Sequence, residues 1–422
     1  MKFRVTGKQN LNGEVTISGA KNSATPILAA SLLTEQLVTL KQFPTQLHDA
    51  IEKMKFVSNL GVDIDIDNSL SELRINASDF NADKIISFDL PIRTTYLLAA
   101  SMLCRTGKAK IPYPGGCKIG SRGYDLHIMV WTKLGCTVVE KEDYIEVTGW
   151  LNGSEINFPL STVGGTENAI MCGVVATGQT TIRNAYVTPE VEDLINFLRE
   201  MGANITLEGS SYIKIQGNSG LLNGTSYSIM PDRIEALTWI ILCSVLGGNL
   251  CIKNINFDDL EIPLIHLKHA GINIFRNDLN TALVNPACIS THGIQPFELA
   301  CGAHPGIISD MQPFYVFLAM FAEGRSVIYD YRYPERIKYA QELAKFTNNN
   351  IFTQSGRIEV KGQADLKAAY VTSPDLRGSM ALAMAALCAD GTSEVDDIDM
   401  ALRGYNNLPE KLKKLGIKAE WV

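Results

Sequence analysis

The sequence predicts an α+β protein made of two similar halves, and three observations support this class. One pattern of helices and strands recurs six times, at a spacing of about 70 residues. The first helix of each copy is apolar nearly all round, which is typical of a helix that is buried on every side. Helices and strands both occur in each copy, as they do in mixed domains. We therefore expect two halves of three copies each, with the apolar helices inside and the sheets outside.

Each copy begins with an alanine-rich helix, continues through a turn of small residues into a β-rich stretch, and then has a second, amphipathic helix. A glycine just past a helix end is the expected left-handed cap, and it marks the end of most second helices. The first helices are predicted at Ala24–Leu33, Thr94–Cys104, Glu167–Ala176, Arg233–Leu246, Met311–Ala322 and Gly378–Ala389. The second helices are predicted to end at Leu60-Gly61, Leu134-Gly135, Met201-Gly202, Ala270-Gly271 and Leu415-Gly416, with a degenerate end near Thr347 in the fifth copy. Strands are predicted at Val62–Ile66, Thr137–Val139, Asn204–Leu207 and Ile272–Phe275.

The seam between the halves is predicted near Met230-Pro231-Asp232, between the third and fourth copies. A spare strand, Gly13–Ser18, precedes the first helix. It either starts the first half or crosses over to complete the second. We expect one domain over residues 20–229 and a second formed by residues 1–19 and 230–422.

Composition narrows the classes of function. With 422 residues, of which 46% are hydrophobic and 20% charged, the chain can bury large cores. Its net charge of -7 argues against nucleic acid and acidic membranes as partners. The nine cysteines form no CxxC pair, which argues against a zinc site and for a reducing compartment. Without a signal sequence or a bilayer-spanning apolar run, we expect a cytoplasmic protein with small-molecule substrates and no metal or cofactor.

One glycine-rich stretch carries the strongest chemical signal, Pro114-Gly-Gly-Cys117-Lys-Ile-Gly-Ser-Arg122-Gly-Tyr-Asp-Leu-His127. Glycines permit backbone conformations that other residues avoid, so the stretch is predicted to be a loop. Lys118 and Arg122 favour thiolate over thiol at Cys117, which makes a reactive cysteine plausible. The alternative is a glycine-rich turn in which the cysteine has no chemical role.

Charged residues gather where the buried helices begin. Such a helix start offers free N–H groups and a partial positive charge, which suit an anionic ligand. The residues are Lys21 and Asn22, Arg93, Glu167 and Asn168, Asp232 and Arg233, Asp310, and Asp375 with Arg377. For Asp232, Glu167 and Asn168 the competing interpretation is helix capping or packing. Lysine and arginine are poor caps, so their placement, with that of Arg122 and Arg403, favours a cleft for a multiply anionic substrate.

These motifs resemble the UDP-N-acetylglucosamine 1-carboxyvinyltransferase family of enolpyruvyl transferases, along the full chain and in order. The family's relative of different chemistry, enolpyruvylshikimate-phosphate synthase, lacks the cysteine loop. The matching motifs are Gly19-Ala-Lys21-Asn22-Ser23, Pro114-Gly-Gly-Cys117, Gly120-Ser-Arg122, Asp232-Arg233-Ile-Glu235, His304-Pro305, Ser309-Asp310-Met-Gln312, Asp375-Leu-Arg377 and Arg403-Gly-Tyr405. The resemblance implies two inverse α/β barrels, each of three units, with the active site in the cleft between them. It also implies that the N-terminal stretch completes the second barrel.

The resemblance further implies transfer of enolpyruvyl from phosphoenolpyruvate to UDP-N-acetylglucosamine, in the first committed step of bacterial peptidoglycan synthesis. Cys117 would donate a proton to the methylene carbon and would be the target of fosfomycin, and Asp310 would accept the proton of the sugar 3-hydroxyl. Lys21, Arg403 and Asp375 would complete the catalytic set, and Arg377 would serve domain closure. Phosphoenolpyruvate would bind to Lys21, Asn22, Arg122 and Arg403. The nucleotide sugar would bind to Asn22, Arg93, Arg122, Gly123, Tyr124, Asp125, Leu126, His127, Leu160, Ser161, Thr162, Val163, Asp310 and Arg332.

Four positions depart from the family pattern, all outside the predicted phosphoenolpyruvate set. His48 and Leu160 stand where some members have a basic residue, Arg332 where a small apolar residue is usual, and Leu402 where an acid is usual. Arg332 could hold an additional anionic group or point to solvent. The sequence therefore leaves open a relative that transfers enolpyruvyl to another nucleotide or nucleotide sugar. A catalytically silent binding protein is the third reading, and the retained Lys21, Cys117 and Asp310 argue against it.

Overall fold

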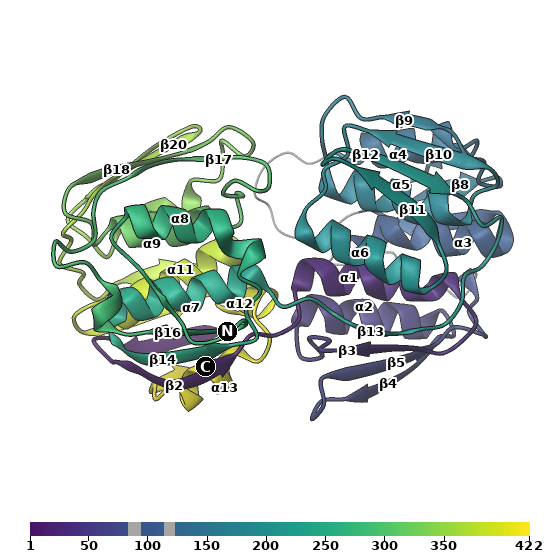
Figure 1. Cartoon of the computed structure of the whole chain (residues 1–422). Coiled ribbons are helices and arrows are strands. Elements are labelled where there is room, and N and C mark those ends of the chain that lie inside the picture. Colours follow the sequence, from purple (N-terminus) through teal and green to yellow (C-terminus); the bar gives the residue numbers. More distant parts are fainter. Residues whose placement is uncertain (83–93, 114–122) are drawn as a thin grey trace. The chain divides into compact units, whose positions relative to one another are not determined.

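The computed structural model describes residues 1–82, 94–113 and 123–422, and Cys117, Arg122 and Arg93 lie outside the described residues. The described chain separates into two compact units (Figure 1). We call residues 19–82, 94–113 and 123–230 the N-terminal unit, and Met1–Ser18 with Pro231–Val422 the C-terminal unit. That these units are independent domains at the predicted boundaries stays a prediction, because compactness does not establish independent folding.

The N-terminal unit contains helices around which three sheets are arranged (Figure 1). The sheets are ordered β13-β3-β5-β4, β6-β8-β7 and β11-β12-β10-β9. Their strands are β3 (Val38–Lys41), β4 (Asp63–Asp67), β5 (Glu72–Asn76), β6 (Lys108–Pro112), β7 (Thr137–Glu140), β8 (Tyr144–Thr148), β9 (Glu155–Asn157), β10 (Gln179–Arg183), β11 (Asn204–Glu208), β12 (Tyr212–Gln216) and β13 (Ser226–Ser228). The helices are α1 (Lys21–Ala30), α2 (His48–Asn59), α3 (Ala99–Thr106), α4 (Asp125–Lys133), α5 (Val163–Val175) and α6 (Pro189–Glu200).

The C-terminal unit has three four-stranded sheets, ordered β21-β22-β1-β23, β15-β16-β14-β2 and β17-β18-β20-β19. Their strands are β1 (Lys2–Thr6), β2 (Leu11–Thr16), β14 (Gly248–Lys253), β15 (Phe275–Arg276), β16 (Thr281–Val284), β17 (Glu298–Cys301), β18 (Arg325–Asp330), β19 (Ile351–Gln354), β20 (Arg357–Lys361), β21 (Tyr370–Thr372), β22 (Thr392–Asp396) and β23 (Ala419–Trp421). The helices are α7 (Arg233–Leu246), α8 (Glu261–His269), α9 (Gln312–Ala319), α10 (Lys338–Ala344), α11 (Leu376–Cys388), α12 (Asp399–Leu402) and α13 (Leu408–Lys414).

The sheets repeat one pairing pattern, as the sequence repeat predicts. In each four-stranded sheet one edge strand pairs parallel with its neighbour and the remaining pairs are antiparallel. Parallel neighbours need a long crossover, and in three sheets a buried helix provides it: α5 joins β9 to β10, α9 joins β17 to β18, and α11 joins β21 to β22.

Two of these edge strands are exchanged between copies of the repeat. Strand β2 precedes α1 but pairs with β14, which follows α7, and β13 precedes α7 but pairs with β3, which follows α1. The predicted spare strand therefore belongs to the C-terminal unit, and the alternative in which it starts the first half is wrong. Hydrogen bonds fix both crossing segments, from Asp232 N–H to the Ser18 carbonyl and from Ala20 N–H to the Met230 carbonyl, each 2.8 Å.

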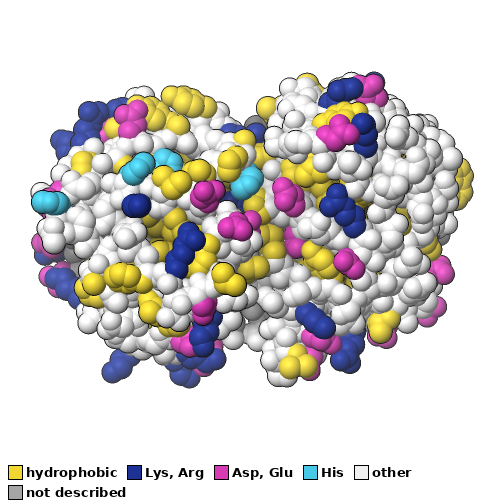
Figure 2. Space-filling model, in the orientation of Figure 1, with side chains coloured by type: hydrophobic (Ala, Val, Ile, Leu, Met, Phe, Trp, Pro, Cys, Tyr) yellow, Lys and Arg dark blue, Asp and Glu magenta, His cyan; other side chains and the backbone are white. Residues whose placement is uncertain are grey.

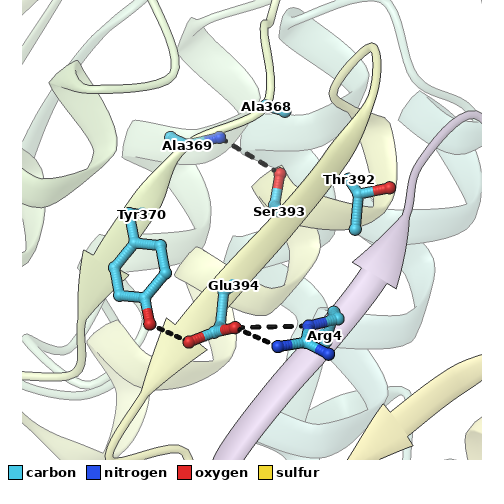
Figure 3. Close-up of a pocket in the computed structure, with 7 residues that line it drawn as sticks. All are labelled: Arg4, Ala368, Ala369, Tyr370, Thr392, Ser393 and Glu394. Atoms are coloured by element: carbon cyan, nitrogen blue, oxygen red, sulfur yellow. Dashed lines mark hydrogen bonds and ion pairs between the residues drawn. The ribbon is translucent and has the colours of Figure 1, made fainter.

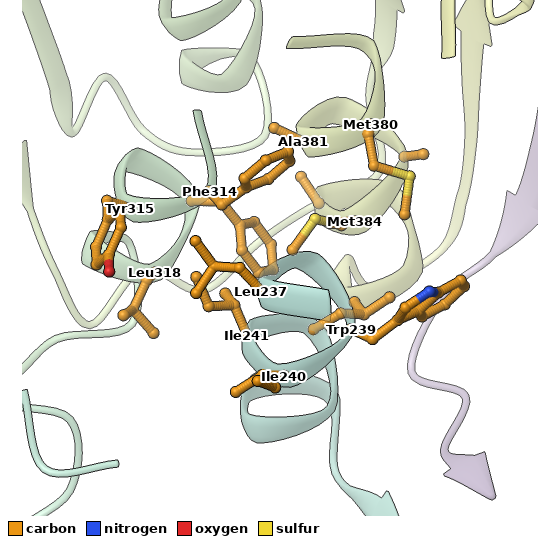
Figure 4. Close-up of a cluster of buried hydrophobic side chains, with 14 of the residues drawn as sticks. Leu237, Trp239, Ile240, Ile241, Phe314, Tyr315, Leu318, Met380, Ala381 and Met384 are labelled. Carbon is orange, nitrogen blue, oxygen red and sulfur yellow. The ribbon is translucent and has the colours of Figure 1, made fainter. Parts of the chain in front are cut away.

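The core of the C-terminal unit is formed by α7, α9 and α11, which lie between its sheets (Figures 1 and 4). Every residue of α9 is buried, because the helix carries no charge and packs against neighbours on all sides. Leu237, Phe314 and Met384 are among the side chains that meet there (Figure 4). Truncating a buried aromatic such as Phe314 to alanine is expected to cost about 3–5 kcal/mol.

The predicted helices are present, and most of their boundaries are shifted. Arg233–Leu246 is found as predicted, whereas α9 ends at Ala319, three residues early. Helix α5 begins at Val163 and not at Glu167, because Thr162 caps it by accepting a hydrogen bond from Gly165 N–H. The second copy starts with a 3-10 turn, Thr94–Leu98, and becomes α-helical only at Ala99. The predicted strand Ile272–Phe275 was too long, since only Phe275–Arg276 pairs as a strand.

The five glycines predicted to end the second helices have the left-handed backbone that this role requires. Their φ angles lie between 86° and 97°. They are Gly61, Gly135, Gly202, Gly271 and Gly416. In the degenerate fifth copy Asn349 has a φ of 59° and takes over the left-handed position, which asparagine tolerates.

Two surface properties bear on partners. On the face seen in Figure 2, basic side chains lie among acidic ones on both units, as expected of a chain with a small negative net charge. Within the described ranges, no helix is both long enough and apolar enough to cross a membrane.

Candidate active site

The start of α1 carries the first predicted phosphoenolpyruvate residues. Helix α1 begins at Lys21, and its N-cap residue Ala20 makes no side-chain cap hydrogen bond, so the cap side chain does not occupy the first N–H groups. The Lys21 ammonium lies 3.0 Å from an Asp49 carboxylate oxygen, in a largely buried ion pair between α1 and α2. Asn22 follows on the first turn and is half-buried. A cation beside an uncapped helix start is a suitable place for a phosphate or a carboxylate.

Two aspartates in the C-terminal unit are helix caps. One carboxylate oxygen of Asp232 accepts from Ile234 and Glu235 N–H at 2.8 and 3.1 Å, and starts α7. One carboxylate oxygen of Asp375 accepts from Arg377 and Gly378 N–H, both at 3.1 Å, and starts α11. The capping interpretation is therefore confirmed for Asp232, and Asp375 has the same structural role.

Asp310 differs from these caps. It precedes α9, whose N-cap is Met311 and which has no side-chain cap. One oxygen of Asp310 lies 3.3 Å from Arg336 Nη1, the other lies 3.8 Å from Arg377 Nε, and 30% of the side chain remains exposed. A carboxylate that is flanked by cations but still accessible can take a proton from a substrate.

Arg336 was missed by the sequence analysis, although it organises this cluster. Its guanidinium donates to the Ser309 carbonyl and to Asp375, both at 2.7 Å, as well as contacting Asp310. Burial alone lowers the pKa of Arg336, but the Asp375 and Asp310 carboxylates outweigh it and raise that pKa above its ordinary value. Arg336 lies in an irregular segment before α10, two residues after Pro334. That segment contains no recognisable sequence motif that would have pointed to this arginine.

Arg377 connects the same cluster to the Arg-Gly-Tyr motif. Its Nη1 donates to the Gly404 carbonyl at 3.2 Å, and its guanidinium stacks over the Tyr405 ring at 5.3 Å. A side chain at Gly404 would collide with Leu376, since a Cβ there would lie 2.2 Å from Leu376 Cδ2. Glycine is thus required between Arg403, which is half-buried, and Tyr405, which is buried. The structure brings Asp310, Asp375 and Arg377 together, as predicted from their places at helix starts.

Apart from Asn22 on α1, the described members of the predicted nucleotide-sugar set in the N-terminal unit lie at or just before the starts of α4 and α5. His127 stacks on Tyr96 with 4.1 Å between ring centres, and its ring lies against the backbone of Gly164 in the first turn of α5. Tyr124 donates to Glu140 at 2.7 Å, and this hydrogen bond raises the pKa of Tyr124 to about 12. Asp125, Leu126 and Val163 lie in the first turns of the two helices, with Gly123 before α4 and Ser161 and Thr162 before α5.

Three of the positions that depart from the family pattern differ in how exposed their side chains are. Leu160 is 62% exposed, unusually so for a leucine. The Arg332 side chain is exposed, while its backbone N–H is held at 3.0 Å by Asp330. Leu402 is buried at the end of α12, where an apolar side chain packs well.

Glu167 and Asn168 proved to be buried interior residues of α5 rather than residues at its start. As helix-start residues they were wrongly predicted, because the small residues before them resemble a loop. Asn168 accepts from Trp131 Nε1 at 3.3 Å, so packing is its role. Glu167 lies in a buried charged group with Lys53, and burial raises the pKa of Glu167 to about 8.

A separate surface hollow of about 310 Å³ lies over β21, β22 and β1, and none of the residues that line it is a predicted site residue (Figure 3). Its polar groups satisfy one another: Glu394 accepts from Lys2 at 2.7 Å, from Arg4 at 2.9 Å and from Tyr370. The hydrogen bonds from Lys2, Tyr370 and Arg4 lower the pKa of Glu394 to about 2. We assign no catalytic role to this hollow.

Comparison with known proteins agrees with the class of enzyme that this fold and these helix starts indicate. A model of the EPSP synthase (3-phosphoshikimate 1-carboxyvinyltransferase) family matches residues 5–412. The chain therefore belongs to the enolpyruvyl (carboxyvinyl) transferases and is an enzyme of that family.

Its relatives within the family include named UDP-N-acetylglucosamine 1-carboxyvinyltransferases. The protein of that name from Acidobacterium capsulatum is 36% identical over 420 residues, which cover 98% of this chain and 94% of the relative. The one from Idiomarina loihiensis is also 36% identical, over 100% of this chain and 99% of the relative.

Solved structures share the fold. The enolpyruvyl transferase NikO from Streptomyces tendae has a TM-score of 0.88 at 23% identity, over 99% of this chain and 98% of that one. An EPSP synthase from Acinetobacter baumannii has a TM-score of 0.73 at 15% identity, over 99% of both chains. At these identities the likeness concerns the fold alone.

Proposed function

We propose that this enzyme transfers the enolpyruvyl group of phosphoenolpyruvate to the 3-hydroxyl of UDP-N-acetylglucosamine and releases phosphate, the first committed step of peptidoglycan synthesis. The observation that carries the proposal is the Asp310 carboxylate, which is partly exposed and held between Arg336 and Arg377 before a buried helix. The names of the 36% identical relatives support the choice of acceptor.

The proposal includes the finer architecture. Each unit would be an inverse α/β barrel of three repeats, with substrates bound in the cleft between the two. The repeated edge-strand pairing and the helices buried inside each unit support the barrels. The binding cleft itself rests on the resemblance of the sequence motifs to the family.

In the proposed reaction, Asp310 takes the proton of the sugar 3-hydroxyl as its oxygen bonds to the enol carbon of phosphoenolpyruvate. The Cys117 thiol gives its proton to the methylene carbon, which becomes a methyl group. Loss of phosphate and of one methyl proton from this tetrahedral adduct then leaves the enol ether. Lys21, Arg122 and Arg403 would neutralise the phosphate and carboxylate groups, and arginine suits both by binding in a fork. Each positioned acid or base is typically worth about 10²–10⁴-fold in rate.

A phosphate-release assay tests the function and discriminates between acceptors. Phosphoenolpyruvate is supplied with UDP-N-acetylglucosamine, with other UDP-sugars and with free nucleotides. We expect release to depend on UDP-N-acetylglucosamine. Release with another nucleotide alone would establish the alternative acceptor, and release with none would indicate a silent binding protein.

Labelling tests the role of Cys117. Fosfomycin, an epoxide phosphonate, should give one adduct by intact-mass analysis, and Cys117→Ser should abolish it. Two other cysteines provide internal controls, because burial makes them poor thiolates: it raises the pKa of Cys136 to about 11 and that of Cys243 to about 12. An adduct on any of these would overturn the assignment.

Leu160 and Arg332, which depart from the family pattern, lead to a prediction about the affinity for UDP-N-acetylglucosamine. Both side chains are exposed, and both stand at positions of the predicted acceptor set. A lost charge-assisted hydrogen bond at Leu160 is worth about 1.5–3 kcal/mol, or roughly one to two powers of ten in affinity. We expect weak binding of UDP-N-acetylglucosamine, strengthened by Leu160→Lys with Arg332→Val, as titration calorimetry would measure. Tight binding that the double change does not improve would mean that the departures are neutral.

A further inference from the structure

A fully buried lysine lies beside the predicted phosphoenolpyruvate residues and has no part in the chemistry proposed above. Lys53 is 0% exposed, in the interior of α2. Its ammonium donates to the Thr25 carbonyl of α1 at 2.7 Å. A buried ammonium is costly unless something compensates for lost water, so its retention calls for a physical reason.

Lys53 forms the second of two parallel links between α2 and α1. Asp49 and Lys53 are four residues apart on α2, and Lys21 and Thr25 are four residues apart on α1, so each pair shares one helix face. Asp49 holds the Lys21 side chain at 3.0 Å, and Lys53 holds the backbone one turn further along. The two links together fix both the direction and the axial position of the start of α1.

The start of α1 needs this external support. Pro26 lies inside α1 and has no N–H, so it cannot donate to the carbonyl of Asn22 as other helical residues would. The first turns are held instead by neighbouring helices: by Asp49 and Lys53 from α2, and by Asp193 of α6, which accepts from the Ser23 hydroxyl. The residues that this turn presents are Lys21 and Asn22.

Glu167 of α5 is also buried and interacts electrostatically with Lys53. Burial lowers the pKa of Lys53 to about 7, and the Glu167 carboxylate opposes that shift. Glu190 of α6 acts on Glu167 in turn and raises its pKa. Helix α5 is thereby electrostatically tied to the link between α1 and α2.

We propose that Lys53 is a positioning residue for phosphoenolpyruvate: by holding the backbone of α1 at Thr25, it fixes the place of Lys21 and Asn22. This inference rests on the proposed function. It predicts that loss of Lys53 affects phosphoenolpyruvate more than the acceptor, since Asn22 is the one described acceptor residue on α1 and the others of this unit lie at or just before the starts of α4 and α5.

The test uses the full chain with Lys53→Met, which keeps the length of the side chain and removes its charge and donor. The matched control is Lys55→Met, on the same helix but exposed and paired only with Glu52 in the described contacts. We expect the KM for phosphoenolpyruvate to rise roughly tenfold in Lys53→Met, as the loss of one charged hydrogen bond predicts, and the KM for UDP-N-acetylglucosamine to change less than about twofold. The control should match the wild type. An equal rise in both KM values, or a fall in kcat alone, would overturn the proposal.

Hydrogen exchange gives a second readout that does not depend on turnover. Amides of residues 21–30 should exchange faster in Lys53→Met than in the control, while amides of α13 should not change. If Lys53→Met does not fold, Lys53→Gln serves instead, because it stays polar but removes the charge and shortens the reach of the side chain toward the Thr25 carbonyl; faster exchange in the same segment is then expected. Unchanged exchange there would overturn the proposal, whereas a wild-type enzyme without phosphate release would overturn the proposed function and not this link.

Discussion

The start of α1 in the N-terminal unit differs in charge from the starts of α7 and α11 in the C-terminal unit. In the C-terminal unit, Asp232 and Asp375 cap α7 and α11, so the first N–H groups are occupied by the chain's own carboxylates. In the N-terminal unit, α1 starts without a side-chain cap and presents Lys21. An anion is attracted to the second kind of start and not to the first. On this basis we expect phosphate to be recognised at α1, whereas Asp232 and Asp375 hold the starts of α7 and α11, and Asp310 caps no helix.

The largest expected effect on stability comes from replacing Arg336, the buried arginine that contacts both Asp310 and Asp375. Arg336→Met leaves Asp375 buried without its partner and Asp310 without one of its two cations. Removing one member of a buried ion pair costs about 3–5 kcal/mol in the free energy of unfolding. Urea denaturation would measure this loss, with the exposed Lys338→Met as control. Equal stability of the two variants would contradict the role of Arg336.

Removing the cation at the uncapped helix start should abolish activity. Lys21→Ala deletes a charge that we expect to contact phosphoenolpyruvate, and the loss of such a contact typically costs about 2–5 kcal/mol. Steady-state turnover should fall accordingly while circular dichroism shows a folded protein. Lys55→Ala, an exposed lysine on α2, should behave as the wild type. Turnover near normal in Lys21→Ala would refute the assignment.

A capping aspartate should give a small effect of a different kind. Asp232→Ala removes both cap hydrogen bonds of α7 and should lower the free energy of unfolding by about 1 kcal/mol. Asp232→Asn is the matched variant, because asparagine caps equally well, and it should retain the stability. If asparagine destabilises as much as alanine, the charge near Arg377 matters more than the cap.

The parts of this fold that sequence could predict are those with local signals. Helix α7 was predicted at its observed bounds because an aspartate cap and a closing glycine flank an apolar run. The start of α5 was missed because Val163-Gly-Gly resembles a loop, and only the hydrogen bond to Thr162 reveals the cap. The exchange of β2 could not be decided from sequence, because its partner strand β14 is more than two hundred residues away along the chain.

In the candidate site, too, the residues that could be predicted from sequence are those that belong to recognisable motifs. Motifs identified Asp310, Asp375 and Arg377, and their convergence follows from the repeated helices. Arg336 and Lys53 could not be found, because a buried charge is recognised by its partners and both partners are distant in sequence. The roles of Cys117, Arg122 and Arg93 stay predictions.

The most direct test of the account measures both products of one reaction, in the wild type and in Asp310→Asn. With phosphoenolpyruvate and UDP-N-acetylglucosamine, the wild type should yield phosphate and the enolpyruvyl ether in equal amounts. Asp310→Asn should lose about 10²–10⁴-fold in kcat, as expected of a missing general base, and remain folded, because Arg336 keeps its bond to Asp375 and Arg377 keeps its bond to the Gly404 carbonyl. Phosphate without the ether, or an Asp310→Asn enzyme of normal rate, would contradict the central claim.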